Sequence, residues 1–306
     1  RRRVPNVTPR QSAHRGRSVD ELLPFGVEIR DKPAGPSAHQ VSAWARDAAG
    51  VDRAAHAGTL DPKVTGCLPI LLGDATRVAQ VFLEGTKEYV AVLELHGAAP
   101  ADLDGVVSEF EGEIYQKPPR KSAVTRRLRS RTIHALEVLE VRDRQALLRI
   151  RCESGTYVRK LCHDLGLAAG TGAHMGHLRR TATDPFDDTD LVSTADLTDA
   201  LAFAADGDEA PLREVVAPAE RALTHLPHLT VAASAADQIA DGAPVYAPGV
   251  VDADPAAESA AAGDSDTESP LVVCVTPDET AVCLGRLVGD PSAEAGTVVS
   301  LERVLV

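Results

Sequence analysis

The last part of the chain consists of short apolar runs that are too brief for helices. Five of them follow one another between His228 and Val306: HLTVAAS, APVYAPGVV, PLVVCVTP, TAVCLGRLV and GTVVSLERVLV. Turn-forming or polar residues separate them. Short strands at regular spacing with glycine punctuation are typical of a small closed sheet. We therefore expect a small β-barrel at the C-terminal end.

The region before this barrel mixes helix and strand patterns. Ser37 to Gly50, SAHQVSAWARDAAG, predicts a helix with Ser37 as N-cap and Gly50 at its C-terminal end. KEYVAVLELHG from Lys87 and QALLRIRCES from Gln145 have the pattern of strands. Thr156 is expected to cap the next helix, whose inward-facing residues are Val158, Leu161 and Leu165. Together with the barrel, these patterns predict an α+β protein.

Charge is distributed unevenly along the chain. Residues 187–306 carry 23 Asp+Glu against 4 Arg, a net charge of −19, while residues 1–186 carry 28 Lys+Arg against 22 Asp+Glu, a net of +6. The two sum to the total of −13. Such asymmetry indicates a first part that faces a polyanion. The acidic remainder, rich in Asp and Ala, indicates adaptation to high salt.

Three segments differ from the rest of the chain in composition: a basic arm without periodicity, a connecting region and an acidic insert. The N-terminus to about Asp20 is basic, Asp187 to about Pro227 is acidic and Ala-rich with helical patches, and Asp252 to Pro270 is acidic and of low complexity. The third is expected to be a disordered loop. The five cysteines are odd in number and never in CxxC spacing, which argues against a disulfide framework or a zinc site and favours a reducing cytoplasm. No apolar run is long enough to cross a bilayer.

The stretch TLDPKVTG places a single acid, Asp61, between a leucine and a proline with glycines nearby. Taken alone, it has an ordinary structural interpretation. Asp61 would be a helix N-cap and Pro62 the first helical residue, since both residue types favour these positions.

Six separated stretches, in one order, carry a family resemblance. They are DKPAGPSAHQV from Asp31, HAGTLDPKVTGCLPILLGDATR from His56, KEYVAVLELHG from Lys87, GEIYQKPPRKSAV from Gly112, CESGTYVRKLCHDLG from Cys152 and GAHMGHLRRTATDPF from Gly172. With them the chain resembles the dyskerin-type archaeal and eukaryotic pseudouridine synthases, within the larger family named for the bacterial TruB enzyme. IYQKPPRKSAV followed by RRLRSR is closer to the guide-RNA-dependent branch, whereas Ser37-Ala38-His39 departs from the usual TSHEV.

The resemblance implies an organisation into three parts. Residues 1–19 would form a basic arm that packs on the barrel, and residues 20–212 a catalytic domain with a mixed β-sheet and a central cleft. Residues 213–306 would form a PUA RNA-binding barrel with the acidic insert 252–270. No cofactor or metal is implied.

The resemblance also implies that Asp61 is the catalytic aspartate. Conversion of uridine to pseudouridine breaks the N1–C1′ bond, turns the freed uracil and rejoins it through C5. One carboxylate can act as nucleophile toward C1′ or assist departure of the uracil. A second carboxylate, as in glycosidases that admit water, would invite hydrolysis instead.

Five further residues match family positions around this aspartate. Tyr89 would stack on the flipped uracil, Arg159 would pair with Asp61, and His56, Leu178 and Lys32 would border the substrate pocket. Each also has a structural alternative: a core tyrosine, a solvated helix arginine, a turn histidine, a core leucine and a strand-end lysine.

RNA contacts are expected in two places. The segment Gln116–Arg131 has seven basic residues and no acid, and by resemblance it is the thumb loop that grips substrate RNA; a solvated charged loop is the alternative. Its candidates are Lys117, Arg120, Lys121, Arg126, Arg127, Arg129 and Arg131. In the barrel, Gly242 and Gly249 would allow close approach of guide RNA, unless the barrel only supports the catalytic domain.

The resemblance predicts isomerisation of uridine in rRNA, directed by an H/ACA guide RNA, in the archaeal cytoplasm. Its partners would be the guide and three small proteins: one near the catalytic domain, one that regulates substrate turnover and one kink-turn RNA binder. Guide-independent modification of the tRNA T-loop is the alternative within the same chemistry. A non-catalytic RNA-binding scaffold and a nucleoside hydrolase are alternatives of other classes.

Overall fold

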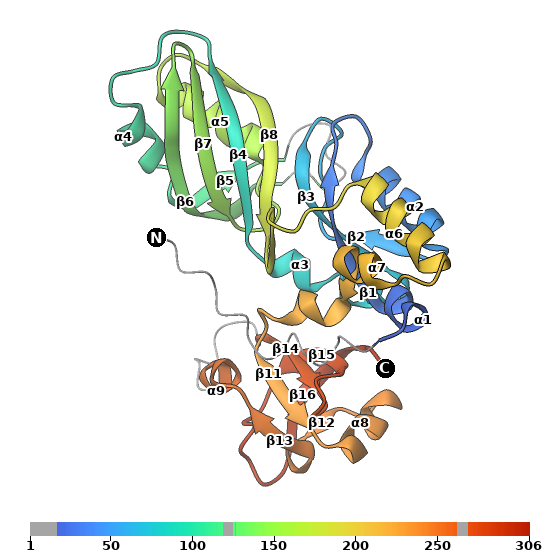
Figure 1. Cartoon of the computed structure of the whole chain (residues 1–306). Coiled ribbons are helices and arrows are strands. Elements are labelled where there is room, and N and C mark those ends of the chain that lie inside the picture. Colours follow the sequence, from blue (N-terminus) through green and yellow to red (C-terminus); the bar gives the residue numbers. More distant parts are fainter. Residues whose placement is uncertain (1–16, 119–124, 126, 262–268) are drawn as a thin grey trace, which may run out of the picture.

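The computed structural model describes residues 17–118, 125, 127–261 and 269–306. Within them the chain forms two sheets, a large one in the upper part of Figure 1 and a smaller one below it, and helices flank both. The expected α+β class is confirmed. No helix in the described part of the chain is long and apolar enough to span a membrane.

The large sheet is mixed and consists of two halves. All of its strand pairs are antiparallel except β3 with β8, which are parallel and joined through only two register pairs, Thr65 with Arg179 and Gly66 with Arg180. This narrow connection is the seam between the halves. The strand order is β10 (Ala217–Pro218), β1 (Gly26–Lys32), β3 (Thr65–Leu72), β8 (Ala173–Thr183), β4 (Lys87–Leu95), β7 (Gln145–Cys152), β6 (Arg129–Arg142) and β5 (Gly112–Gln116), with β2 (Ala54–His56) on β3 and β9 (Phe186–Asp187) on β8.

Helix α2 (Ala38–Ala49) covers the first half of the sheet together with α6 (Thr194–Ala205). Its start is a reciprocal cap, since the Ser37 hydroxyl accepts from Gln40 N–H while the Gln40 side chain accepts from Ser37 N–H. It ends at Gly50 in the left-handed region, with φ of 65°. The predicted helix and both of its ends are confirmed.

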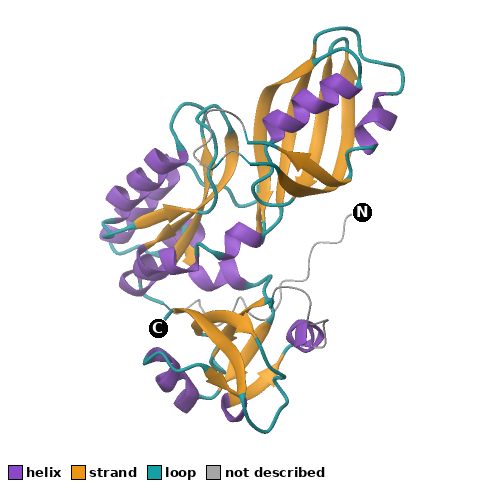
Figure 2. Ribbon diagram, turned by 180° about the vertical axis from the view of Figure 1, so that it is seen from behind, coloured by secondary structure: helices purple, strands orange, loops and turns teal. Residues whose placement is uncertain are grey.

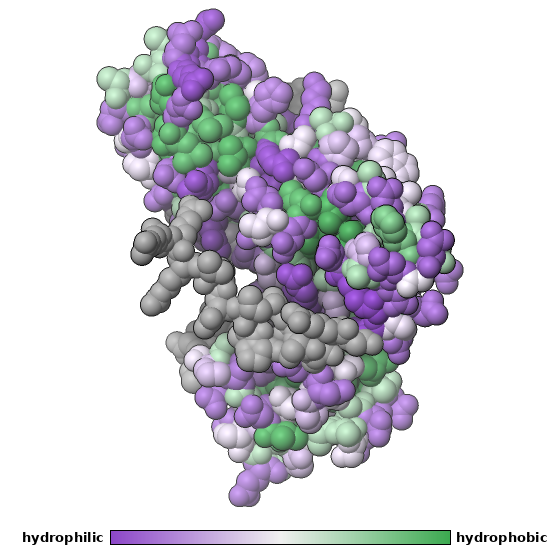
Figure 3. Space-filling view, in the orientation of Figure 1, coloured by the Kyte–Doolittle hydropathy of each residue, from purple (hydrophilic) through white to green (hydrophobic). Residues whose placement is uncertain are grey.

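Helix α5 (Val158–Ala168) covers one face of the second half, as Figure 2 shows. Val158, Leu161 and Leu165 are buried under it as predicted. The expected cap is wrong, because Tyr157 occupies the N-cap position and the Thr156 hydroxyl donates to the Glu153 carbonyl instead. The opposite face of this half carries no helix among the described residues, and apolar side chains gather on it in Figure 3.

Shorter helices complete the part around the large sheet. They are α1 (Val19–Leu22), η2 (Leu23–Phe25), η3 (Gly73–Val78), α3 (Val81–Glu84), α4 (Leu103–Ser108), α7 (Ala210–Val215) and η4 (Ala219–Leu223). The helical patches expected after Asp187 therefore correspond to α6, α7 and η4. Of the expected N-terminal arm, residues 1–16 lie outside the described part. Arg17 binds Glu220 through two hydrogen bonds, so the end of the arm lies against η4.

The small sheet contains all five predicted runs. Its order is β12 (Val245–Tyr246), β16 (Thr297–Val304), β15 (Ala281–Leu287), β14 (Leu271–Val275), β11 (His228–Val231) and β13 (Val250–Ala253), with η5 (Ala247–Gly249) and α8 (Ala233–Ala240) between strands. The expectation of a disordered loop over 252–270 is wrong for its first part. Strand β13 extends to Ala253, and α9 (Pro255–Ala261) follows because Asp254 accepts from Ala257 N–H and the Ala257 side chain is buried. Residues 262–268 lie outside the described part.

The two sheets share one hydrophobic core. Val27 and Leu71 from the large sheet belong to the same buried cluster as Val273 and Leu284 from the small one. Strand β10 pairs with β1, so the expected boundary between residues 212 and 213 falls inside α7, before the last strand of the large sheet. We place the boundary after η4.

Candidate active site

Asp61 lies on a loop between β2 and β3, at the seam of the large sheet. The loop turns at residues 61–64, where Val64 N–H donates to the Asp61 carbonyl at 2.9 Å. No helix follows, so the interpretation of Asp61 as a helix cap is wrong. Gly58 and Gly66 flank the loop with φ values of 95° and 98°, and a side chain at Gly66 would lie 2.2 Å from the Arg180 carbonyl.

The side chain of Lys32, at the end of β1, binds this loop. Its ammonium donates to the carbonyls of Pro33 at 2.9 Å, Pro62 at 3.0 Å and Val64 at 2.8 Å, and the residue is fully buried. Burial lowers the pKa of Lys32. All three N–H groups are used by the backbone, so this lysine holds the loop and does not line a pocket, contrary to the expectation.

Arg180 on β8 binds the same loop, and it is not among the site residues predicted from the sequence. Its Nε donates to the Cys67 carbonyl at 2.7 Å and its Nη2 to the Gly58 carbonyl at 3.4 Å. The guanidinium also bonds the Tyr89 hydroxyl. It is 1% exposed. The only signal in the sequence is the pair of arginines in HLRRTA, and the strand register decides which of them turns inward.

Arg159 meets Asp61 from the other half of the sheet. It is the second residue of α5, and its guanidinium forms an ion pair with the Asp61 carboxylate. The two side chains are 53% and 52% exposed. The carboxylate is therefore oriented by a guanidinium and remains accessible to a large substrate.

Tyr89 and Leu178 lie at the seam itself. Both side chains pack against the buried cluster under α5 and also against the cluster under α2. Burial raises the pKa of the Tyr89 phenol, while the charge of Arg180 acts in the opposite direction. The seam thus has an apolar wall with a neutral phenol, which Arg180 connects to the loop that carries Asp61.

His56 ends strand β2, next to the loop. Its Nδ1 is buried and has no hydrogen-bond partner among the described residues. Its pKa is lowered by burial, and the positive charges of His39 and Arg180 add to this. The lowered pKa favours a neutral imidazole, and the ring is half-buried beside the loop.

The described basic residues of the expected thumb segment differ in their surroundings. Lys117 and Arg127 are exposed. Arg131 is engaged, because its guanidinium pairs with Glu153 at 3.3 Å and bonds the Ser130 carbonyl, whereas the buried Nε of Arg129 has no described partner. Arg120, Lys121 and Arg126 lie outside the described residues.

The two glycines expected to approach RNA are also different. Gly242 follows α8 with φ of 93°, and nothing lies within 4 Å of the position where a Cβ would be. At Gly249 a Cβ would lie 2.8 Å from the Cβ of Ala235 in α8. Packing inside the small domain therefore accounts for Gly249, and only Gly242 offers open backbone.

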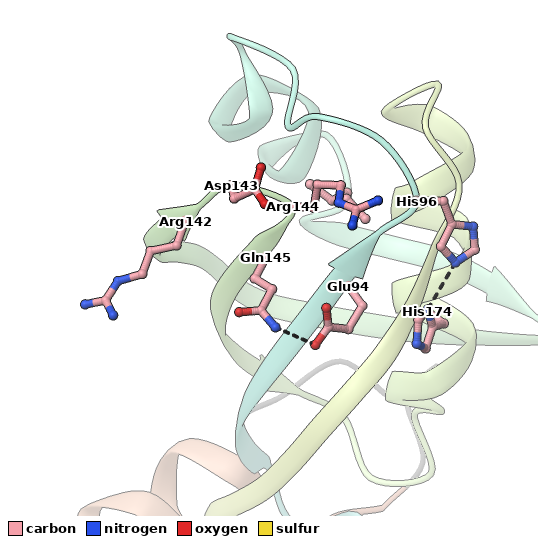
Figure 4. A pocket seen from close by; sticks show the side chains of 8 residues that line it. Glu94, His96, Arg142, Asp143, Arg144, Gln145 and His174 are labelled. Carbon is pink, nitrogen blue, oxygen red and sulfur yellow. Dashed lines mark hydrogen bonds between the residues drawn. The ribbon is translucent and has the colours of Figure 1, made fainter.

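A hollow of about 630 Å³ lies at the other end of β4 from Tyr89 and is shown in Figure 4. Glu94 binds Gln145 there, and the rings of His96 and His174 are joined by a hydrogen bond of 3.0 Å. These side chains are polar, mutually paired and remote from Asp61. The candidate site is therefore the ion pair at the seam and not this hollow.

The arrangement supports nucleophilic chemistry by one carboxylate. No group of three or more potential metal ligands is present in the described ranges. An oriented carboxylate beside a phenol and an apolar wall can attack a sugar carbon or stabilise positive charge on it. The half-exposed position of this carboxylate suits a nucleotide that is part of an RNA chain and is turned out of it into the site.

Comparison with known proteins identifies the family. The N-terminal domain of TruB family pseudouridylate synthase matches residues 46–105 and 97–158, and the tRNA pseudouridylate synthase B C-terminal domain matches residues 159–224. A probable tRNA pseudouridine synthase B of Haloarcula marismortui is 66% identical over 95% of this chain and 91% of its own length. That of Methanocaldococcus jannaschii is 44% identical over 94% and 85%.

Solved structures give the same result for the fold. A chain of a Cbf5–Nop10–Gar1 complex superposes with a TM-score of 0.87 at 40% identity, covering 95% of this chain and 88% of that one. A chain of an H/ACA ribonucleoprotein bound to substrate RNA gives 0.84 at 38% identity, covering 95% and 88%. The expected fold is confirmed, and the chain belongs to the TruB family of pseudouridylate synthases, enzymes that isomerise uridine in RNA to pseudouridine.

Proposed function

We propose that this chain is the catalytic subunit of an H/ACA ribonucleoprotein that converts uridine in rRNA to pseudouridine under the direction of a guide RNA. Its similarity to chains from such complexes extends over 95% of its length, the small domain included. The observation that carries the catalytic part is the accessible ion pair of Asp61 with Arg159 at the seam.

The roles of the site residues follow from their positions. Asp61 attacks C1′ or supports its positive charge while the N1–C1′ bond breaks. The uracil turns against Tyr89 and Leu178, and C5 bonds to C1′ while any bond from Asp61 to C1′ breaks and the free carboxylate is restored. The C5 proton leaves and N1 gains a proton, so that the reaction is an isomerisation. Arg159 orients the carboxylate, and the half-buried ring of His56 borders the extruded nucleotide. A single acid on the loop disfavours hydrolysis.

Lys117 and Arg127 are the described cations best placed to hold phosphates, because both are exposed. In the small domain we assign guide-RNA contact to the open backbone at Gly242. The partner set follows from the related complexes, which contain Nop10 and Gar1, together with a kink-turn RNA binder. We place the assembly in the cytoplasm.

A second candidate function is guide-independent modification of tRNA. Curated relatives, including the one that is 66% identical, carry the name tRNA pseudouridine synthase B. The catalytic geometry is the same for both substrates, because only the nucleotide at the seam takes part in the chemistry.

The test separates the two substrates. The chain is incubated at high salt with rRNA fragments or tRNA transcripts, each with and without guide RNA and the small partner proteins, and pseudouridines are mapped by their altered reverse transcription after chemical modification. We expect product in rRNA only with guide and partners. Product in tRNA without guide supports the second function, and product in neither, under conditions where RNA is bound, contradicts the catalytic proposal.

A further inference from the structure

Gln116 is one of the few polar side chains that are buried in this protein, with 1% exposure. It is the last residue of β5 and the first residue of the basic segment Gln116–Arg131, and its register partner is Arg129, the first residue of β6. A primary amide in such a place needs hydrogen-bond partners for its oxygen and its N–H groups.

Both ends of the Gln116 amide bind the backbone of one residue, Tyr157. The Gln116 Oε1 accepts from Tyr157 N–H at 2.9 Å, and the Gln116 Nε2 donates to the Tyr157 carbonyl at 3.2 Å. A side chain that bonds both main-chain groups of one residue fixes the position and the orientation of that peptide.

Tyr157 is the N-cap of α5. Its carbonyl also accepts from the N–H groups of Lys160 and Leu161, both at 3.0 Å, which closes the first turn. The first N–H groups of a helix lack partners within the helix, and no side chain of Tyr157 caps this end. Gln116 thus supplies from a strand the contact that the local sequence does not.

Arg159 lies two residues beyond Tyr157, in this first turn. Its guanidinium reaches Asp61 across the seam, so a shift of the helix start shifts the guanidinium with it. Glu153, just before the helix, is tied to the same strands, since it accepts from Thr132 N–H at 3.0 Å and its own N–H donates to the Thr132 carbonyl at 2.9 Å. The base of the thumb segment and the entrance of α5 form one hydrogen-bonded unit.

We propose that Gln116 is a positioning residue for catalysis: it holds the first turn of α5 so that Arg159 meets Asp61. This inference rests on the proposed role of Arg159. Gln116 itself is buried and does not touch the substrate.

The first test replaces the amide by an apolar chain of similar length. With Gln116→Met, we expect the single-turnover rate to fall about tenfold to 100-fold, because small misplacements of a catalytic group have effects of this size. The Kd for substrate RNA should change by less than about threefold. Glu113→Gln, an exposed change on the same strand, is the matched control and should leave both values unaltered.

A double-mutant cycle then distinguishes positioning from general support of the fold. In an Arg159→Ala background the target of the positioning is gone, so adding Gln116→Met should cost no further rate. Full additivity of the two losses would overturn the inference. A wild-type complex without activity would instead count against the proposed function itself.

Gln116→Glu keeps the inference testable if Gln116→Met does not fold. A carboxylate accepts from Tyr157 N–H but repels the Tyr157 carbonyl, whereas the protonated acid can donate to it. Burial favours the protonated form. We expect the rate of Gln116→Glu, relative to wild type at the same pH, to rise between pH 8 and pH 6. A ratio that does not change with pH would contradict the assigned contact.

Discussion

The two members of the Asp61–Arg159 ion pair are held in different ways. On the Asp61 side, two buried cations, Lys32 and Arg180, bind five backbone carbonyls on and around the loop. On the Arg159 side, the neutral amide of Gln116 binds the entrance of α5 at two points.

The difference teaches how a loop and a helix are made rigid. A loop has few internal hydrogen bonds, so its carbonyls need strong donors from outside, and charged donors give the stronger bonds. A helix is already rigid along its length and needs support only where its first N–H groups lack partners. The loop that carries Asp61 is therefore held by charged donors, and the helix start that carries Arg159 is held by the neutral amide of Gln116.

The largest effect is expected from removing the negative charge of Asp61, which the supports on both sides of the ion pair hold in place. Asp61→Asn should reduce pseudouridine formation to background, because an amide neither attacks C1′ nor pairs with Arg159. Gel-shift measurements should show RNA binding close to that of the wild type. Asp52, an exposed acid on the other side of β2 in the sequence, provides the control, and Asp52→Asn should remain active. Activity of Asp61→Asn would exclude the carboxylate mechanism.

The cationic clamp can be broken at Arg180. Arg180→Met leaves the Cys67 and Gly58 carbonyls without their donor and should lower the free energy of unfolding by about 2–4 kcal/mol, as measured by urea denaturation. The neighbouring Arg179 pairs with Asp31 on the surface, with 38% of its side chain exposed. Arg179→Met should cost about 1 kcal/mol or less. Equal losses for both variants would show that the buried clamp has no special importance.

A third buried cation sharpens the comparison through pH. The Lys87 ammonium donates to the Phe82 and Gly85 carbonyls, and burial lowers the pKa of Lys87 to about 8. The unfolded chain, with an ordinary lysine pKa, then binds more protons above pH 8, so stability rises with pH there. Between pH 8 and pH 10 the wild type should gain about 2 kcal/mol relative to Lys87→Met.

Urea denaturation at pH 8, 9 and 10 measures this difference directly. Comparing each protein with the other at the same pH removes the contribution of all remaining groups. If the difference in unfolding free energy stays constant over this range, the pKa of Lys87 is not lowered in the folded protein. Burial of a cation against carbonyls would then carry no measurable desolvation cost.

The smallest effects are expected on the exposed basic residues. Each of Lys117→Ala and Arg127→Ala should lower the slope of log Kd against log salt by about one for substrate RNA. Arg142→Ala, at the far end of β6 with its side chain 80% exposed, is the matched control. An equal effect of all three would mean that RNA responds only to overall charge.

The sequence was sufficient for the parts that depend on local pattern. The helix from Ser37 to Gly50 follows from its cap and apolar spacing, and the five runs after His228 all became strands of the small sheet. The family resemblance singled out Asp61 and Arg159, which the structure joins.

What the sequence could not supply is the register between distant strands. Arg179 and Arg180 are adjacent and of the same type, yet one forms a surface ion pair and the other is buried beside the loop. The family resemblance predicts Lys32 at the border of the pocket, whereas the structure buries it at the end of β1, and no local pattern in the sequence indicates that burial. Gln116 was counted only as the start of a basic segment, since its partner lies 41 residues away.

Local signals were also misread where tertiary contacts compete with them. Asp61 followed by Pro62 has the composition of a helix start, but the carbonyls of Pro62 and Val64 bind Lys32. The acidic composition after Asp252 favours disorder, but burial of Ala257 and the cap from Asp254 stabilise α9. In both cases a single buried contact outweighs the intrinsic preference.

The core shared by the two sheets limits how far the small sheet can move relative to the large one. Arg286 on β15 reinforces that core at its edge, because it bonds Glu84 of α3 and Glu302 of β16 at once. Because buried residues of both sheets pack in one cluster, moving one sheet relative to the other would expose apolar surface. In the proposed function, this core fixes the separation between the RNA contact proposed at Gly242 and the carboxylate of Asp61. The protein would then select its target nucleotide by the distance along the RNA between that nucleotide and the anchored end.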